Sequence, residues 1–190
     1  MVKSVPWAFF VSSIRFASNS LIANANLVTK IYMPRESVPI ASVLSQLMDF
    51  LVAAAVLVVV LVVIGTPIRA GLFWIPGLVL LLILLATPLG VFLSAAALFF
   101  RDVKYIVEVI LTFAIFFTPV FYEVELFGRW STLLLLNPAA PLLEGIGAAV
   151  TGRPLPAPVW LVYSGVLAIG GGIASLVFFK RVEPYFAESI

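Results

Sequence analysis

The 190-residue sequence contains no cysteine and no histidine. Without cysteine the chain can form no disulfide, no thiolate nucleophile and no Cys-ligated metal centre. Without histidine it lacks the commonest general base and the commonest nitrogen ligand for metals. G-x-x-x-x-G-K-[ST], G-x-S-x-G and H-E-x-x-H motifs are missing too. These absences argue against an enzyme, and we expect no cofactor.

Charged residues are scarce, at 11% of the chain against 63% hydrophobic residues. Soluble domains carry about 25% charged residues. A soluble fold of this composition would expose large apolar patches to water, which monomers rarely do. The net charge of +2 is too small to indicate a nucleic-acid partner. The composition therefore predicts an integral membrane protein, whose main partner is the lipid bilayer.

Long apolar runs predict several membrane-spanning helices. A helix needs about 20 apolar residues to cross about 30 Å of hydrocarbon. We expect complete spans at residues 38–64, 72–100, 103–122 and 159–179. Helices are favoured over strands because a lone strand would leave its backbone unpaired in lipid. The expected fold class is an all-α, polytopic transmembrane helix bundle that forms a single domain.

Two further segments are apolar but interrupted. Residues 5–23 look like the later part of a span, because Arg15 interrupts the apolar stretch. Within the external segment expected at 123–158, residues 133–150 are apolar in pieces that are broken by Asn137, Pro138, Pro141 and Glu144. This pattern favours a re-entrant or interfacial hairpin over a complete span.

The distribution of lysine and arginine predicts the orientation. If spans alternate, residues 24–37, 99–105 and 180–190 share one side of the membrane. This side has six basic residues, against three on the other side. We therefore expect the first side, with the C-terminal tail 180–190, in the cytoplasm and residues 123–158 outside. The six basic residues are Lys30, Arg35, Arg101, Lys104, Lys180 and Arg181, and the three are Arg69, Arg129 and Arg153.

The predicted cytoplasmic stretch SNSLIANANLVTKIYMPRES, residues 18–37, has apolar positions at helical spacing with polar residues between them. It predicts a short amphipathic helix that ends at Pro34. Two interpretations remain open: the helix docks a cytoplasmic partner, or it rests on lipid headgroups. The apolar positions are Leu21, Ala25, Val28 and Tyr32.

Aromatic residues gather near the end of the predicted third complete span. Phe113, Phe116 and Phe117 stand at i, i+3 and i+4, and Tyr122 follows them. Aromatic faces can stack on sugar rings, so one interpretation is a surface along which a carbohydrate slides. The other is lipid-facing bulk with an interfacial aromatic belt.

One carboxylate, Asp49, lies about a third of the way into the span predicted at 38–64. A charge at membrane depth costs at least about 2.5 kcal/mol, so such a residue is a functional candidate. The simpler expectation is that Asp49 faces a neighbouring helix and pairs with a hydroxyl or backbone group.

Four stretches together resemble the permease of type-2 ABC exporters for cell-surface polysaccharides. PWAFF with SNSLIANANLVTKIYMPRE, within residues 6–36, is similar to the end of the second span and the cytoplasmic coupling helix. FFRDVKYIVEVILTFAIFFTPVFY, residues 99–122, is similar to the fifth span and its amphipathic entry. LLLLNPAAPLLEGIGAAVTG, residues 133–152, resembles the external gate-helix segment. FFKRVEPYFAESI, residues 178–190, resembles the cytoplasmic end.

The resemblance implies a six-span permease in the bacterial plasma membrane that forms a homodimer around a channel. It also implies a separate ATPase subunit under each permease, and a polysaccharide or lipid-linked glycan as substrate. By the same resemblance, the chain lacks the first span and part of the second, so an N-terminally truncated permease is expected. The alternatives are an exporter of a drug or lipid, and a membrane assembly protein that transports nothing.

The resemblance also assigns residues to roles. The segment 24–36 would contact the ATPase, and the aromatic group would line the substrate path. The implied coupling residues are Asn26, Lys30, Tyr32, Pro34 and Arg35, and the implied channel residues are Phe113, Phe116, Phe117 and Tyr122.

Overall fold

The computed structural model describes residues 2–26, 33–66 and 70–186, and every regular element in these ranges is a helix. The expected all-α fold is therefore confirmed. The α-helices are α1 (Ser4–Ala23), α3 (Ser37–Val63), α4 (Ile75–Phe99), α5 (Val103–Ala114), α6 (Ser131–Leu135), α7 (Ala139–Thr151) and α8 (Pro158–Val182), and the 3₁₀ helices are η1 (Ala70–Trp74), η2 (Val124–Trp130) and η3 (Glu183–Tyr185).

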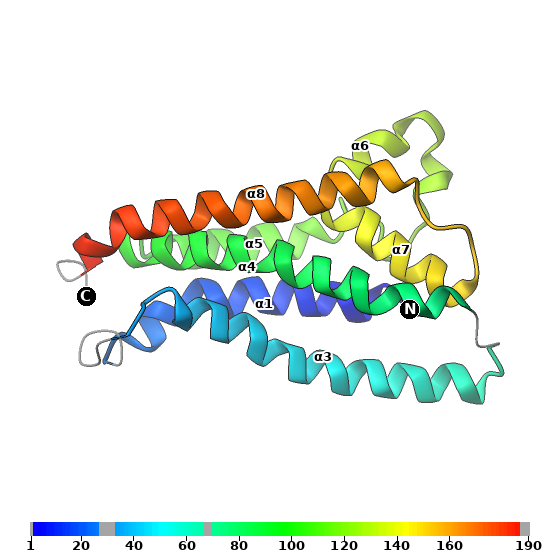
Figure 1. The fold of residues 1–190 in the computed structure, drawn as a ribbon, viewed down its shortest axis with the longest axis horizontal. Helices are drawn as coiled ribbons and strands as arrows, with labels where there is room; N and C mark the ends of the chain where they lie inside the picture. The colour runs from blue at the N-terminus through cyan, green and yellow to red at the C-terminus, as the bar shows by residue number, and fades with distance from the viewer. Residues whose placement is uncertain (1, 27–32, 67–69, 187–190) are drawn as a thin grey trace.

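The long helices run side by side along one axis, with the two chain termini toward opposite ends (Figure 1). Helix α4 is central and packs against α1, α3 and α8. We call the end that holds Arg35, Phe99 and Phe186 the C-terminal end. The other end, which holds Lys3 and helix α7, is the N-terminal end.

Three helical stretches among the described residues are long and apolar enough to cross a membrane: Ser37–Val63, Gly71–Phe99 and Pro158–Tyr185. They differ in how far the chain itself covers them. In the most apolar part of Gly71–Phe99, half of the residues are buried within the chain. In the most apolar part of Ser37–Val63, only 6% are buried. Asp49 lies on the exposed surface of α3, so the expectation that it faces a neighbouring helix of this chain is wrong.

Helix α1 continues eight residues beyond Arg15, to Ala23. Arginine is a good helix former, so its charge does not stop a helix that can turn it outward. Arg15 is exposed, whereas Ile14, Ala17 and Leu21 on the neighbouring positions are at most 2% exposed. The buried face of α1 therefore continues past Arg15, because the arginine lies on the opposite, exposed face of the helix.

Helix α5 ends at Ala114, eight residues before the end of the span expected at 103–122. Pro119 explains part of this difference, because a proline disfavours the helical conformation of the residue before it. At 1.5 Å per residue, the 12 residues of α5 reach about 18 Å, which is too short to cross the hydrocarbon layer.

Small residues allow α1 and α4 to approach each other closely. Gly90 of α4 is buried, and a Cβ atom added there would lie 2.6 Å from the Cβ atom of Ala17. Ala86 and Ser94, four residues to either side, are fully buried. Rows of small residues at this spacing typify helix contacts in membranes. This row is therefore a packing surface.

Candidate transport and coupling surfaces

A buried lysine holds the N-terminal end together. The Nζ atom of Lys3 donates hydrogen bonds to the carbonyl oxygens of Pro119, at 3.0 Å, and Tyr122, at 2.9 Å. It also forms an ion pair with Oε1 of Glu144 at 2.6 Å. The side chains of Lys3 and Glu144 are only 9% and 13% exposed. An ammonium group has three hydrogens to donate, and each has an acceptor here.

The same contacts fix the segment that follows α5. Oε1 of Glu144 also accepts the backbone N–H of Val124, at 3.1 Å. One turn along α7, a Cβ atom added to Gly147 would lie 3.0 Å from Cε of Lys3. Glycine at this position leaves room for the lysine stem. The network thus ties the start of α1, residues 119–124 and helix α7 into one unit.

Sequence reasoning gave Lys3 and Glu144 no role in the site, although both are isolated charges within apolar stretches. That isolation is the signal that could have found them, since a charge surrounded by apolar residues needs a partner. What the sequence does not supply is which partner, because 141 residues separate the two side chains.

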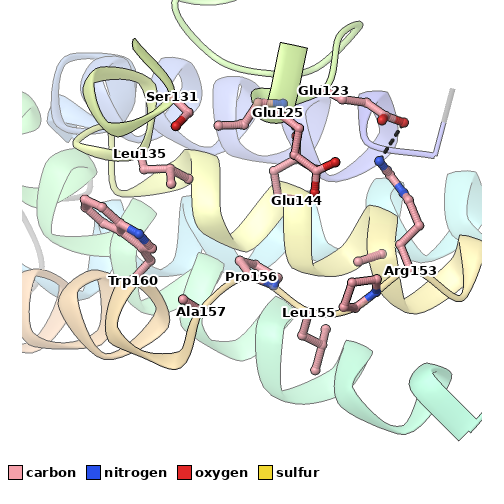
Figure 2. A pocket seen from close by; sticks show the side chains of 13 residues that line it. Glu123, Glu125, Ser131, Leu135, Glu144, Arg153, Leu155, Pro156, Ala157 and Trp160 are labelled. Atoms are coloured by element: carbon pink, nitrogen blue, oxygen red, sulfur yellow. Dashed lines mark hydrogen bonds and ion pairs between the residues drawn. The ribbon is translucent and has the colours of Figure 1, made fainter. Parts of the chain in front are cut away.

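Beside Glu144 lies a cavity of about 280 Å³, open to the surface (Figure 2). Arg153 and Glu123 close one side of it with an ion pair of 2.6 Å, and Trp160 lies on the other side. The lining includes three glutamates and one arginine, so its charge disfavours an anionic occupant. Among the described residues, no group of three acidic residues could hold a metal ion. The glutamates are Glu123, Glu125 and Glu144.

Polar contacts also hold Asn137 and Pro138, which lie between α6 and α7. Asn137 donates from Nδ2 to Oγ1 of Thr118, at 2.9 Å, and its Oδ1 accepts the N–H of Ala139 at 3.1 Å. Oγ of Ser164 in α8 donates to the carbonyl of Pro138 at 2.8 Å. The segment that precedes α7 is therefore bonded both to the residues after α5 and to α8.

The aromatic group predicted for the channel lies on the outer surface of the chain. Phe113 is in α5, but Phe116 and Phe117 lie in the turns after the helix ends. The three rings are between 57% and 70% exposed. Tyr122 donates from its hydroxyl to the carbonyl of Phe116 at 2.9 Å, and its ring contacts that of Phe127. The backbone N–H groups of Phe116 and Phe117 bond to the carbonyls of Phe113 and Ala114, three residues back, so both rings stand on turns that are tighter than an α-helix.

The residues predicted for coupling lie at or next to the C-terminal end, as far as the structure describes them. Lys30 and Tyr32 lie outside the described residues. Asn26 is the last described residue before that gap, and Pro34 is exposed after it. The structure assigns a definite contact to Arg35, whose Nη1 donates to the carbonyl of Glu183 at 2.9 Å.

Arg35 reaches an aromatic cluster formed by the end of the chain. Its guanidinium lies 5.9 Å from the centre of the Phe186 ring. Phe186 is fully buried against Phe179 and Phe99, with ring centres 5.2 Å and 5.7 Å away. Arg35, two residues before α3, thus contacts the segment that follows α8.

The chain forms a bundle of long apolar helices, and hydrogen bonds and ion pairs hold the connecting segments at each end of the bundle. This is the architecture of a multi-pass membrane protein. The chain belongs to the ABC-2 type transporter family, whose model matches residues 1–150. This match confirms the resemblance to type-2 ABC exporter permeases that the sequence motifs indicated.

Three relatives carry the name O-antigen export system permease protein RfbA. Two come from Klebsiella pneumoniae: one is 29% identical over 73% of this chain and 54% of its own length, the other 28% identical over 96% and 71%. The third, from Myxococcus xanthus, is 28% identical over all of this chain and 74% of its own length. The chain thus spans about half of the first relative and nearly three quarters of the other two.

Proposed function

We propose that this chain is the permease part of an ATP-driven exporter that moves a polysaccharide or lipid-linked glycan across the bacterial plasma membrane. The observation that carries the proposal is the family match, together with three relatives that are named for O-antigen export. The ATP is hydrolysed by a separate subunit, because this sequence has no phosphate-binding loop. Two permease copies enclose the path.

In this proposal the C-terminal end faces the cytoplasm. Basic residues gather there, as the positive-inside rule requires. At the N-terminal end, the charges of Lys3 and Arg153 are paired with glutamates. The described basic residues of the C-terminal end are Arg35, Arg101, Lys104, Lys180 and Arg181.

The segment 24–36 couples the permease to the ATPase and docks it through Tyr32, and the aromatic surface around Phe117 contacts the glycan. The exposure of Phe113, Phe116 and Phe117 supports the second assignment, because a sliding surface must be open to its substrate. Tyr32 is the proposed anchor on the ATPase, since a large ring with a polar tip suits a binding hot spot.

Replacement of Tyr32 tests the docking assignment. In the full-length permease, Tyr32→Ala should weaken recovery of the ATPase by about 1–3 kcal/mol, the range expected for a hot spot. Pull-down from solubilised membranes measures this effect. Tyr163→Ala, a tyrosine replacement at the N-terminal end, is the control and should leave ATPase recovery unchanged. Normal ATPase recovery and normal ATP hydrolysis with Tyr32→Ala would refute docking through this segment.

Replacement of Phe117 tests the substrate surface. Phe117→Ala should lower glycan export while the amount of permease in the membrane stays normal, because an exposed ring adds little to packing within the chain. If abundance falls in proportion to export, the ring serves packing against lipid or a second copy, and the sliding surface is wrong.

A further inference from the structure

The C-terminal segment of the chain closes back on the segment proposed to dock the ATPase. Arg35 stands two residues before α3, and its contacts lie 148 residues further along the chain, at Glu183, and at Phe186. One residue on, Glu36 lies 4.0 Å from Nζ of Lys180. Two consecutive residues before α3 therefore contact the last turn of α8 and the residues that follow it.

The anchor of these contacts is buried. Phe186 is fully buried in a cluster that also contains Leu21 of α1 and Val38 of α3. Residues on either side of the 24–36 segment thus pack into the same cluster as the chain end. Val91, Ala95 and Leu98 of α4 complete it.

We infer that Arg35 and Phe186 form a clip that makes the end of α8 move together with residues 33–36, the described part of the coupling segment just before α3. Force applied by an ATPase would then reach α8 directly through the clip. It would reach α1 and α3 through the chain itself. This inference rests on the proposed coupling function, and it makes Arg35 a positioning residue that needs no contact with the ATPase.

The charge of Arg35 suits this role. Its guanidinium donates to a backbone carbonyl and faces an aromatic ring, which are both favourable contacts for this group. A half-buried arginine with these two contacts can hold two elements together. It does not need the strict geometry of a buried ion pair with a carboxylate. Lys180, which is 69% exposed, adds a second and weaker link.

Arg35→Gln in the full-length permease tests the clip, with Arg181→Gln as control because Arg181 is an exposed arginine at the same end. ATPase recovery in a pull-down should stay normal in both variants. Glycan export per ATP hydrolysed should fall about fivefold in Arg35→Gln alone, a modest loss for a coupling contact. Normal export per ATP in Arg35→Gln would overturn the clip. A loss of ATPase binding would overturn it too, since Arg35 would then belong to the docking surface.

Cross-linking provides a second measurement that does not depend on a weakened fold. Glu36→Cys with Lys180→Cys can be joined by a short thiol cross-linker, because the sequence has no cysteine of its own. If the two segments move as one, the cross-linked permease should export at the rate of the uncross-linked double variant. A block of export on cross-linking would show that the contact must open in each cycle, which contradicts the clip. Loss of ATPase recovery in the double variant before cross-linking would also overturn the clip, since Glu36 or Lys180 would then belong to the docking surface, whereas failure of the docking assignment itself is measured by Tyr32→Ala.

Discussion

The two ends of the bundle are each tied together around one basic side chain, but in different ways. At the N-terminal end, Lys3 is buried and all three of its hydrogens have acceptors, one of which is a buried carboxylate. At the C-terminal end, Arg35 holds a backbone carbonyl and faces the buried ring of Phe186. The first end depends on charge and the second on aromatic packing. Breaking the first network leaves a buried charge without its partner, whereas breaking the second removes apolar contact.

The largest effect is expected from breaking the buried pair on one side. Glu144→Ala leaves the ammonium of Lys3 buried without its counter-charge, which should cost about 4 kcal/mol of folding stability. Unfolding in mixed detergent measures the change. Glu125→Ala is the control, since Glu125 lines the same cavity but is exposed. Equal stability of the two variants would show that the buried network contributes nothing.

The second test removes the whole ion pair and sharpens the first. Lys3→Met combined with Glu144→Leu leaves no charge unpaired, so the double variant should be more stable than Glu144→Ala. The carbonyls of Pro119 and Tyr122 lose a donor, which limits the recovery. If the double variant is less stable than the single one, the cost in Glu144→Ala does not come from an unpaired charge.

At the C-terminal end the ring should matter more than the surface charges. Phe186→Ala removes a fully buried ring and should cost about 3 kcal/mol of folding stability. Tyr185→Ala, at an exposed ring next to it, should cost much less. Similar losses in the two variants would mean that the cluster around Phe186 is not a core.

The smallest effect is expected for the exposed ion pair. Lys180→Gln breaks a contact of 4.0 Å in which the lysine is 69% exposed. Stability should change by less than about 0.5 kcal/mol. A loss comparable with that of Glu144→Ala would contradict the contrast between the two ends.

The sequence predicted the long apolar helices because an apolar run of sufficient length is visible in the chain itself. The close contact at Gly90 was not predicted, because the spacing of Ala86, Gly90 and Ser94 does not say that Ala17 packs against it. The pair Lys3–Glu144 could not be predicted, because it depends on how helices far apart in sequence meet. The end of α5 at Ala114 was missed because the apolar run was read as continuous up to Tyr122 despite Pro119.

Some features of the candidate site were predicted and others were not, again because contacts between distant segments are not visible in the sequence. The chemistry of Arg35 is visible in the sequence, but its partner Glu183 belongs to the opposite end of the chain. The ring group is visible in the sequence, but the structure places Phe116 and Phe117 in turns beyond α5 and not within a helix that continues to Tyr122. Long apolar helices were predictable from the sequence, whereas the end of α5 and the contacts between distant segments were not.

The central claim is that the C-terminal end faces the cytoplasm and receives the ATPase. Single cysteines at exposed positions of the two ends, Thr132→Cys and Asp102→Cys, test it directly. On intact cells whose outer barrier is permeabilised, an impermeant thiol reagent should label Thr132→Cys alone. After the plasma membrane is opened, it should label both. Labelling of Asp102→Cys, but not Thr132→Cys, on intact cells would place the ATPase-docking end outside the cell and contradict the account.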